Sequence, residues 1–280
     1  AIVSGGPGAV FWMWISAVLG MMTNYAENYL GITYRYKDEK GQWVGGAMVY
    51  IEKGLGCKWL AVVFSFCCIG ASFGMGNMVQ GNSMANGLKN VFQIPVFFTA
   101  IVSAVVVAYV LNGGMKRIAV CTEKLVPLMA GIYLITACGI LIVCRQRVGW
   151  AFLEIIKNAF TPRAACAGVG GYQLKTVIQT GISRGVFSNE AGLGSSVIAH
   201  VQSDVKKPEI QGMWGIAEIF VDTILVCTVT ALVLLVSGVY RPEICIQNFS
   251  TGIENIDGTT LMARAFGSVI PFGEELLVLS

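Results

Sequence analysis

The sequence contains five apolar segments that are each long enough, or nearly so, to cross a lipid bilayer. A helix needs about 20 predominantly apolar residues for this. The composition agrees, because 55% of the 280 residues are hydrophobic and only 12% are charged, whereas an ordinary soluble domain has about 25% charged residues. We therefore expect an all-α polytopic membrane protein that lies in the lipid bilayer. The expected spans are Ala9–Tyr34, Trp59–Asn82, Pro95–Leu111, Thr122–Val143 and Met213–Val239.

Between the fourth and fifth spans, a further helical stretch is interrupted by glycine. Gly168, Gly170 and Gly171 fall within four residues, and each glycine costs about 1 kcal/mol relative to alanine inside a helix. Backbone groups cannot stay unpaired against lipid, so a break at membrane depth must line a cavity or a binding site. We expect a broken helix over about 160–187, whose second half, Leu174–Phe187, is amphipathic.

Basic residues set the expected orientation, because the cytoplasmic loops of membrane proteins carry an excess of Lys and Arg. The segment 144–163 is expected outside although it also holds basic residues, and its part Trp150–Phe160 is expected to be an amphipathic surface helix. A second outer loop is expected at Tyr240–Phe272, with a short helix at Leu261–Phe266. The most charged loop follows the first span and is expected in the cytoplasm, with Arg35, Lys37, Lys40, Lys53 and Lys58.

Polar side chains inside the apolar segments mark candidate functional positions. Asn77 and Gln80 are three residues apart and share one helix face, so they either bond to a neighbouring helix or line a polar cavity. Glu218 and Asp222 are four residues apart, and an acid at the membrane centre costs roughly 2.5–3.5 kcal/mol, so both should point into the bundle. Glu218 lies near the inner end and can reach water. Asp222 is deeper and suits a structural or gating hydrogen bond.

A second glycine-rich segment, Ser188–Gly194, follows the interrupted helix and precedes a short helix. Its residues Asn189 and Glu190 are also candidates for a gating or structural role. Glu27, at the polar end of the first span, is expected near the membrane surface rather than at a buried proton site.

Several enzyme motifs can be set aside. Gly181–Gly185 matches the G-x-S-x-G pattern of serine hydrolases, but it lies in a helical stretch, and that chemistry needs a strand-to-helix elbow. The single histidine, His200, is expected in a surface loop, and one histidine excludes multi-histidine metal sites. Residues 189–196 lack the G-K-[ST] of a phosphate loop. We expect no enzyme, no cofactor and no metal ligands in this segment, and the net charge of +3 is too small to indicate nucleic acid.

Several tracts spread over the chain resemble the alanine or glycine:cation symporter family. They are GGPGAVFWMW, VGGAMVYIEKGLG, FGMGNMVQGNS, RGVFSNEAGLGSSVIAH and EIFVDTILVCTVTAL. The resemblance implies a leucine-transporter-like fold of two inverted repeats, of which this chain would hold helices two to seven and the start of helix eight. The first-repeat helices would occupy about 9–143, and the second repeat would supply the broken helix at 160–187 and the span 213–239. The chain would thus be one transmembrane domain, 1–280, and an internal fragment of the transporter.

The resemblance also implies a function. Relatives of this kind are sodium-driven symporters of small neutral amino acids such as alanine and glycine, in the bacterial plasma membrane. The sodium site would lie on helices one and eight, outside this chain. The substrate would lie beside Gly168, Val169, Gly170 and Gly171, with Phe73, Asn77 and Gln80 on the opposing helix. Val169 stands where the family often has Phe, which implies room for a side chain larger than that of alanine. An uncoupled facilitator or channel of the same build is the alternative.

Overall fold

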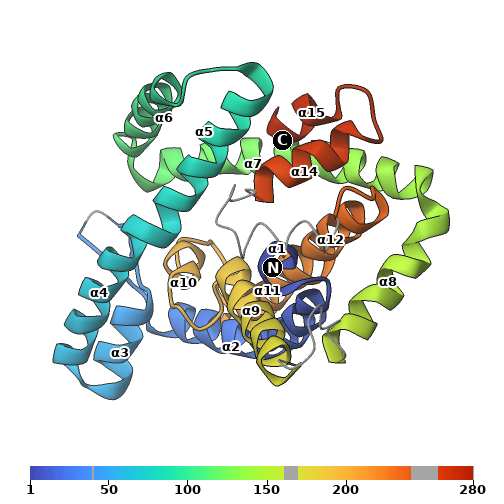
Figure 1. The fold of residues 1–280 in the computed structure, drawn as a ribbon. Coiled ribbons are helices and arrows are strands. Elements are labelled where there is room, and N and C mark those ends of the chain that lie inside the picture. Colours follow the sequence, from blue (N-terminus) through green and yellow to red (C-terminus); the bar gives the residue numbers. More distant parts are fainter. Residues whose placement is uncertain (40, 161–169, 241–257, 280) are drawn as a thin grey trace. The chain divides into compact units, whose positions relative to one another are not determined.

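The computed structural model of the chain describes residues 1–39, 41–160, 170–240 and 258–279, and these are folded almost entirely into helices (Figure 1). The α-helices are α1 (Ile2–Gly5), α2 (Gly8–Tyr34), α3 (Ala47–Leu55), α4 (Lys58–Phe73), α5 (Val79–Phe92), α6 (Val96–Leu111), α7 (Gly114–Val143), α8 (Arg145–Phe160), α9 (Gly170–Asn189), α10 (Ser196–His200), α11 (Pro208–Ile219), α12 (Cys227–Val236), α14 (Gly258–Gly267) and α15 (Gly273–Leu279). Two π-helical segments, η1 (Gly74–Met78) and η2 (Phe220–Val226), join α4 to α5 and α11 to α12. The all-α fold class is confirmed.

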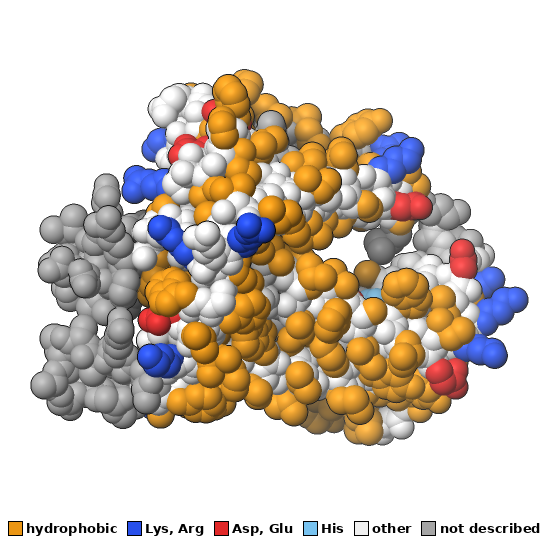
Figure 2. Space-filling view, turned by 90° about the vertical axis from the view of Figure 1, so that its right-hand side faces the viewer, with side chains coloured by type: hydrophobic (Ala, Val, Ile, Leu, Met, Phe, Trp, Pro, Cys, Tyr) orange, Lys and Arg blue, Asp and Glu red, His pale blue; other side chains and the backbone are white. Residues whose placement is uncertain are grey.

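Three helices among the described residues are long and apolar enough to cross a membrane. They are α2, residues 117–143 of α7, and the continuous helix α11–η2–α12, Pro208–Val236; α4 and α6 are shorter apolar helices. Large hydrophobic side chains on these helices are exposed, among them Phe66 at 72%, Phe97 at 77% and Ile135 at 76%. On the face seen in Figure 2, hydrophobic side chains predominate and charged ones form small groups. Such surfaces suit contact with lipid rather than water.

Several helix boundaries differ from the expected ones. The second apolar segment continues as a helix through η1 and α5 to Phe92, because its polar second half keeps helical geometry without an apolar stripe. Helix α7 begins at Gly114 rather than Thr122, so Pro127 lies inside it. The charged loop after α2 also has structure of its own. Its strands β1 (Tyr36–Lys37) and β2 (Trp43–Val44) pair antiparallel, and α3 follows them.

One compact unit comprises residues 1–75 and 154–228. In it, α2 packs along α9 and along α11. Glycines allow the close approach, since a Cβ added at Gly181 would lie 2.5 Å from the Ala9 carbonyl oxygen, and one at Gly185 would lie 3.0 Å from the Ser16 Cβ. The apparent hydrolase motif Gly181–Gly185 is therefore a pair of small residues four apart that brings two helices together, as is common in membrane proteins.

The second unit comprises residues 76–153 and 229–280, described here for 76–153, 229–240 and 258–279. In it, α14 packs on α5, and α15 packs on both α5 and α7. Phe266 is fully buried and stacks on Tyr133 with ring centroids 5.8 Å apart. The helix expected at Leu261–Phe266 is present as α14, and α15 begins at Gly273.

The close contact between α2 and α9 gives a first prediction. Gly181→Ala forces a methyl group against the Ala9 carbonyl and the Trp12 Cβ, and overpacking of this kind costs about 1–3 kcal/mol. The matched control is Gly131→Ala in α7, where an added Cβ meets no described atom within 4 Å and alanine favours the helix by up to about 1 kcal/mol. Thermal unfolding of the two purified variants should show a lower Tm for Gly181→Ala only. Equal Tm values would contradict the packing described.

Candidate functional site

The candidate site lies where α9 and α10 follow α2 through the first unit. Along α2, Ala9 and Ser16 face α9 at Gly181 and Gly185, Gly20 faces Asn189 and Ala191, and Gly31 faces Val197 in α10. Contacts therefore advance along both segments in the same direction, so α9 and α10 form one interrupted helix that runs parallel to α2. The interruption, residues 190–195, lies beside the middle of the 27-residue helix α2.

The interruption has the backbone of a loop rather than a kinked helix. Glu190, Gly192 and Gly194 have φ values of 52°, 86° and 70°, which is the left-handed region that glycine tolerates best. A Cβ added at Gly194 would lie 2.8 Å from the Ala47 Cβ and 2.9 Å from the Phe64 ring. The loop therefore packs tightly as well as turning sharply, and glycine meets both requirements.

Polar side chains satisfy the backbone of this loop. Asn189 is buried, and its Oδ1 accepts a hydrogen bond from the Ala191 N–H at 3.1 Å. The Glu27 carboxylate on α2 accepts one from the Gly192 N–H at 3.3 Å. Glu27 is itself only 9% exposed, so it holds the loop from within the unit rather than facing the surface. Asn189 Nδ2 has no hydrogen-bond partner among the described residues.

The side chain of Asp222 contacts the C-terminal end of α9. The Ser188 hydroxyl donates to Asp222 Oδ2 at 2.7 Å, and the Thr223 hydroxyl donates to the same oxygen at 3.0 Å. Ser188 is the last residue but one of α9, directly before the interruption. The deeper of the two predicted acids thus makes hydrogen bonds inside the bundle, and it makes them at the point where the helix breaks.

A buried amide network ties α10 and α11 to the C-terminal part of α2. Asn24 and Asn28 are fully buried, and Asn28 Nδ2 donates to Asn24 Oδ1 at 3.2 Å. The same oxygen accepts from the Ser196 hydroxyl at 3.2 Å. Asn24 Nδ2 donates to the Gly215 carbonyl and to Glu218 Oε2, both at 3.2 Å. Sequence reasoning missed this network, although residues 24, 27 and 28 form a polar stripe at helical spacing.

His200 extends this network and does not lie in a surface loop as expected. It is the last residue of α10, and its side chain is 15% exposed. Its Nε2 lies 2.9 Å from Glu218 Oε2, and its Nδ1 is hydrogen-bonded to the Gln211 amide. The Glu218 side chain is 46% exposed, so it reaches the surface and also joins α10 to α11. The sequence gives no sign that His200 pairs with Glu218 and Gln211, because both belong to a different helix, α11.

Two groups next to the network lie outside the spans and have shifted pKa values. Burial raises the pKa of the Tyr50 phenol to about 12, and the nearby Glu27 carboxylate adds to this effect. Burial lowers the pKa of Arg35, which Asp204 partly opposes. Arg35 still carries its charge, and its guanidinium donates to the Val201 carbonyl at 2.8 Å and the Ser203 carbonyl at 2.6 Å. The chain after α10 is held in place by these bonds.

The expected substrate residues are only partly within the described structure. Gly168 and Val169 lie outside the described residues, and Gly170 and Gly171 begin α9. Phe73 ends α4 with 68% exposure. Asn77 and Gln80 are exposed, and neither forms a hydrogen bond with another described residue; the π-helical turn η1 also alters their relative direction. Their roles stay predictions.

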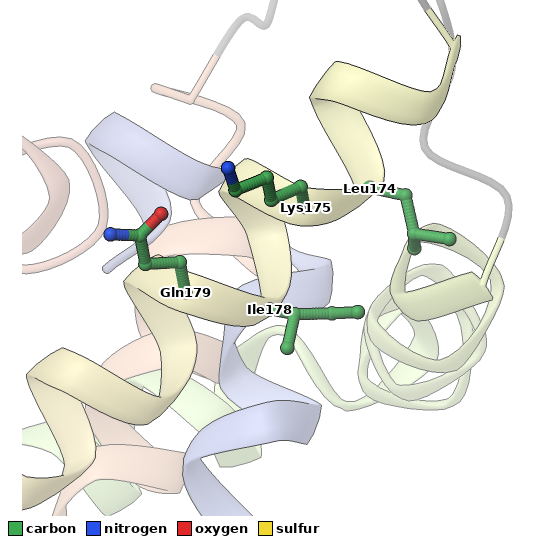
Figure 3. Close-up of a pocket in the computed structure, with 4 residues that line it drawn as sticks. All are labelled: Leu174, Lys175, Ile178 and Gln179. Atoms are coloured by element: carbon green, nitrogen blue, oxygen red, sulfur yellow. The ribbon is translucent and has the colours of Figure 1, made fainter.

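The first turns of α9 carry an open depression lined by four side chains (Figure 3). Leu174 and Ile178 point to one side of the helix, and Lys175 and Gln179 lie on the neighbouring side. The depression is too open to define a ligand.

The sodium:alanine symporter family model matches residues 1–280. The chain belongs to this family. It is 42% identical over 94% of its length to an uncharacterized transporter of Haemophilus influenzae, 40% identical over 98% to the sodium/alanine symporter AgcS of Methanococcus maripaludis, and 39% identical over 85% to the amino-acid carrier protein AlsT of Bacillus subtilis. It covers 59%, 58% and 50% of these relatives. The family is one of transporters, and with its apolar helices the chain is an integral membrane protein.

The amide network gives a second prediction. Asn24→Ala removes a side chain that makes four hydrogen bonds and leaves buried groups without partners, at a cost of about 1–3 kcal/mol or more. The matched control is Asn82→Ala, which removes an exposed amide pair with Asn86 and should change stability by less than about 0.5 kcal/mol. Thermal unfolding of both variants distinguishes them. A Tm for Asn24→Ala equal to that of Asn82→Ala would show that the network adds no stability.

The interruption gives a third prediction. Gly194→Ala and Gly41→Ala both place alanine at a φ near +70°, which costs about 1–2 kcal/mol. Only Gly194 is crowded, by Ala47 and Phe64, whereas an added Cβ at Gly41 meets nothing within 4 Å. Gly194→Ala should therefore lower the Tm by clearly more than Gly41→Ala. The tight packing of the loop is refuted by equal losses in the two variants.

Proposed function

We propose that this chain is part of a sodium-coupled symporter that carries alanine, glycine or a similar small neutral amino acid by alternating access. Membership of the sodium:alanine symporter family and the names of AgcS and AlsT support amino acid transport. The chain spans about half the length of these relatives, so the transport activity is proposed for the whole protein. Its place would be the plasma membrane of a bacterium.

The observation that carries the proposal is the interrupted helix α9–α10 beside the middle of α2. Irregular backbone at membrane depth occurs where it is buried in protein or lines a cavity, and transporters use such breaks to bind substrates and ions. Helix N-termini favour the carboxylate of a zwitterion, and carbonyl groups at a helix end favour its ammonium. In the leucine-transporter-like arrangement, α2 would be helix two, and the broken helix six, expected over about 160–187, would include α9. Its expected break begins outside the described residues, and the interruption at 190–195 follows it.

Two breaks are candidates for the substrate position. Gly168 and Val169 precede α9, Gly170 and Gly171 begin it, and the loop 190–195 follows it. In the proposed arrangement Gly168, Val169, Gly170 and Gly171 bind the amino acid, with Phe73, Asn77 and Gln80 opposite. A gating or structural role at the second break and in the hydrogen bonds around it is proposed for four residues, Asn189, Glu190, Glu218 and Asp222.

Uptake of labelled alanine by the full-length protein in proteoliposomes tests the proposal. An inward sodium gradient should drive accumulation above the outside concentration, and lithium, potassium or proton gradients of equal size should drive less. An inside-negative potential of 100 mV should add about 2.3 kcal/mol per transported charge. Equilibration without accumulation under every gradient would favour the uncoupled facilitator. If the protein takes up no neutral amino acid under any gradient, the proposal of amino acid transport is refuted.

A further inference from the structure

The turn between α3 and α4 exposes basic and apolar side chains next to each other. Gly56 makes this turn with a φ of 68°, and an added Cβ there meets no described atom within 4 Å. Leu55 and Trp59, on its two sides, are 67% and 68% exposed. Lys53 and Lys58 alternate with them along the chain and are also exposed. We call these four residues the α3–α4 tip. The two helices that carry it pack against each other within the first unit (Figure 1).

Aromatic rings hold two of the ammonium groups in this region. Lys53 Nζ lies 3.8 Å from the centroid of the Tyr36 ring, and Lys37 Nζ lies 4.9 Å from that of Trp43. A ring attracts an ammonium group through its face and leaves the N–H donors on the other side free. Neither of these lysines nor Lys58 has a carboxylate oxygen within 4 Å among the described residues. Their ammonium groups therefore have donors for an anion.

The acids of the same segment leave the tip basic. Asp38 lies in the turn of the hairpin β1–β2, where its Oδ1 accepts a hydrogen bond from the Gln42 N–H at 2.7 Å. Glu39 and Glu52 are exposed, and within the described part of the chain neither lies within 4 Å of a lysine nitrogen. The segment Lys53–Trp59 itself contains two lysines and no acid.

An apolar stripe on α4 begins directly after Lys58. Trp59, Val62, Phe66 and Ile69 recur three and four residues apart, so they share one helix face, and all four are exposed. From Trp59 to Ile69 the helix rises about 15 Å at about 1.5 Å per residue, which is close to half of the roughly 30 Å of a hydrocarbon core. The stripe therefore matches the depth of one leaflet, with its basic end where lipid headgroups lie.

We propose that the α3–α4 tip and this stripe bind an anionic phospholipid. Lys53 and Lys58 contact the phosphate, and Trp59 lies at the level of the headgroup, where its amphipathic ring is favoured. One acyl chain lies along Val62 and Phe66. A zwitterionic lipid has the same chains, but its own ammonium group opposes the lysines, so the charge of the tip selects an anionic headgroup. The inference does not rest on the proposed function, because lipid binding needs no transport.

The tip is connected to the loop 190–195 by short contacts. Ala47, the first residue of α3, and Phe64 in α4 both crowd Gly194. Ala47 also belongs to a buried apolar cluster with Val197 and Val201. A lipid that joins α3 to α4 at the tip therefore supports the two helices against which this loop packs. Anionic lipid should accordingly raise the Tm of the full-length protein, because a ligand that binds only the folded state stabilises it.

Tryptophan fluorescence of the full-length protein in phosphatidylcholine vesicles tests the position of the lipid. Brominated phosphatidylglycerol, which quenches tryptophan on contact, should quench more than brominated phosphatidylcholine at the same mole fraction. This excess quenching should disappear in Trp59→Phe. The matched control is Trp214→Phe in α11, which removes another exposed tryptophan and should retain the excess. Persistence of the excess in Trp59→Phe would overturn the inference, as would no excess in the unaltered protein.

Lysine variants test the selectivity for the headgroup. Lys53→Gln combined with Lys58→Gln should raise the phosphatidylglycerol fraction needed for half of the excess quenching by about tenfold or more, because each lysine near an anionic surface contributes about 1 kcal/mol, or about fivefold. The control, Lys206→Gln combined with Lys207→Gln, removes the same charge from two exposed lysines before α11 and should leave this fraction unchanged.

Equal losses in the two double variants would show diffuse attraction to the whole basic surface and would overturn the site. Soluble glycerol phosphate, which has the phosphate without the acyl chains, should not reduce the excess quenching at the same concentration as the lipid. If it does compete, the site binds free phosphates rather than a lipid, and the inference is wrong. None of these readouts depends on amino acid uptake, so a failure here leaves the proposed function standing.

Discussion

The close contact of α2 with the interrupted helix α9–α10 is the interaction on which the first unit depends. It is made by glycines, since Gly181 and Gly185 bring α9 against Ala9 and Ser16, and Gly31 brings α2 against Val197 in α10. In lipid the hydrophobic effect does not hold helices together, so association rests on close van der Waals packing and on hydrogen bonds. Glycine permits the packing because it lets the two backbones approach closely. It also permits the hydrogen bonds, because at this short distance side chains of α2 reach the loop between α9 and α10.

That approach explains why polar residues are buried in α2. The loop 190–195 leaves helical geometry beside the middle of a membrane span, and its N–H groups would be left unpaired against lipid. Glu27 and Asn189 accept from Gly192 and Ala191. Further along, Asn24 accepts from Ser196 and donates toward α11. The loop needs these polar side chains as hydrogen-bond partners, because its N–H groups have no helical partners of their own.

The sequence was informative where one segment determines its own structure. Apolar length predicted the long helices α2, α7 and α11–η2–α12, and the glycine-rich segment Ser188–Gly194 predicted an interruption before a short helix. It was less informative where the structure depends on partners distant in the chain. His200 looked like a loop residue because Glu218 and Gln211 come from another helix. The pair Gly181 and Gly185 resembled a catalytic motif, and only the position of α2 shows that it serves packing. The start of α7 at Gly114 was not predicted, because the charged residues Lys116 and Arg117 interrupt the apolar pattern in the first turns of this helix.

The two halves of the interrupted helix share one kind of attachment and differ in another. Helix α9 is held to α2 by apolar contacts at glycine, which lose their packing if the helices separate. Helix α10 is also held by apolar contacts, because Val197 is fully buried against Gly31 and Ala47. In addition, Ser196 and His200 form hydrogen bonds to Asn24 and Glu218, and the Glu218 side chain is 46% exposed. Water can replace a bond to an exposed carboxylate at little enthalpic loss, so the buried Val197 contact is the part of this attachment that separation of α10 from α2 would lose outright.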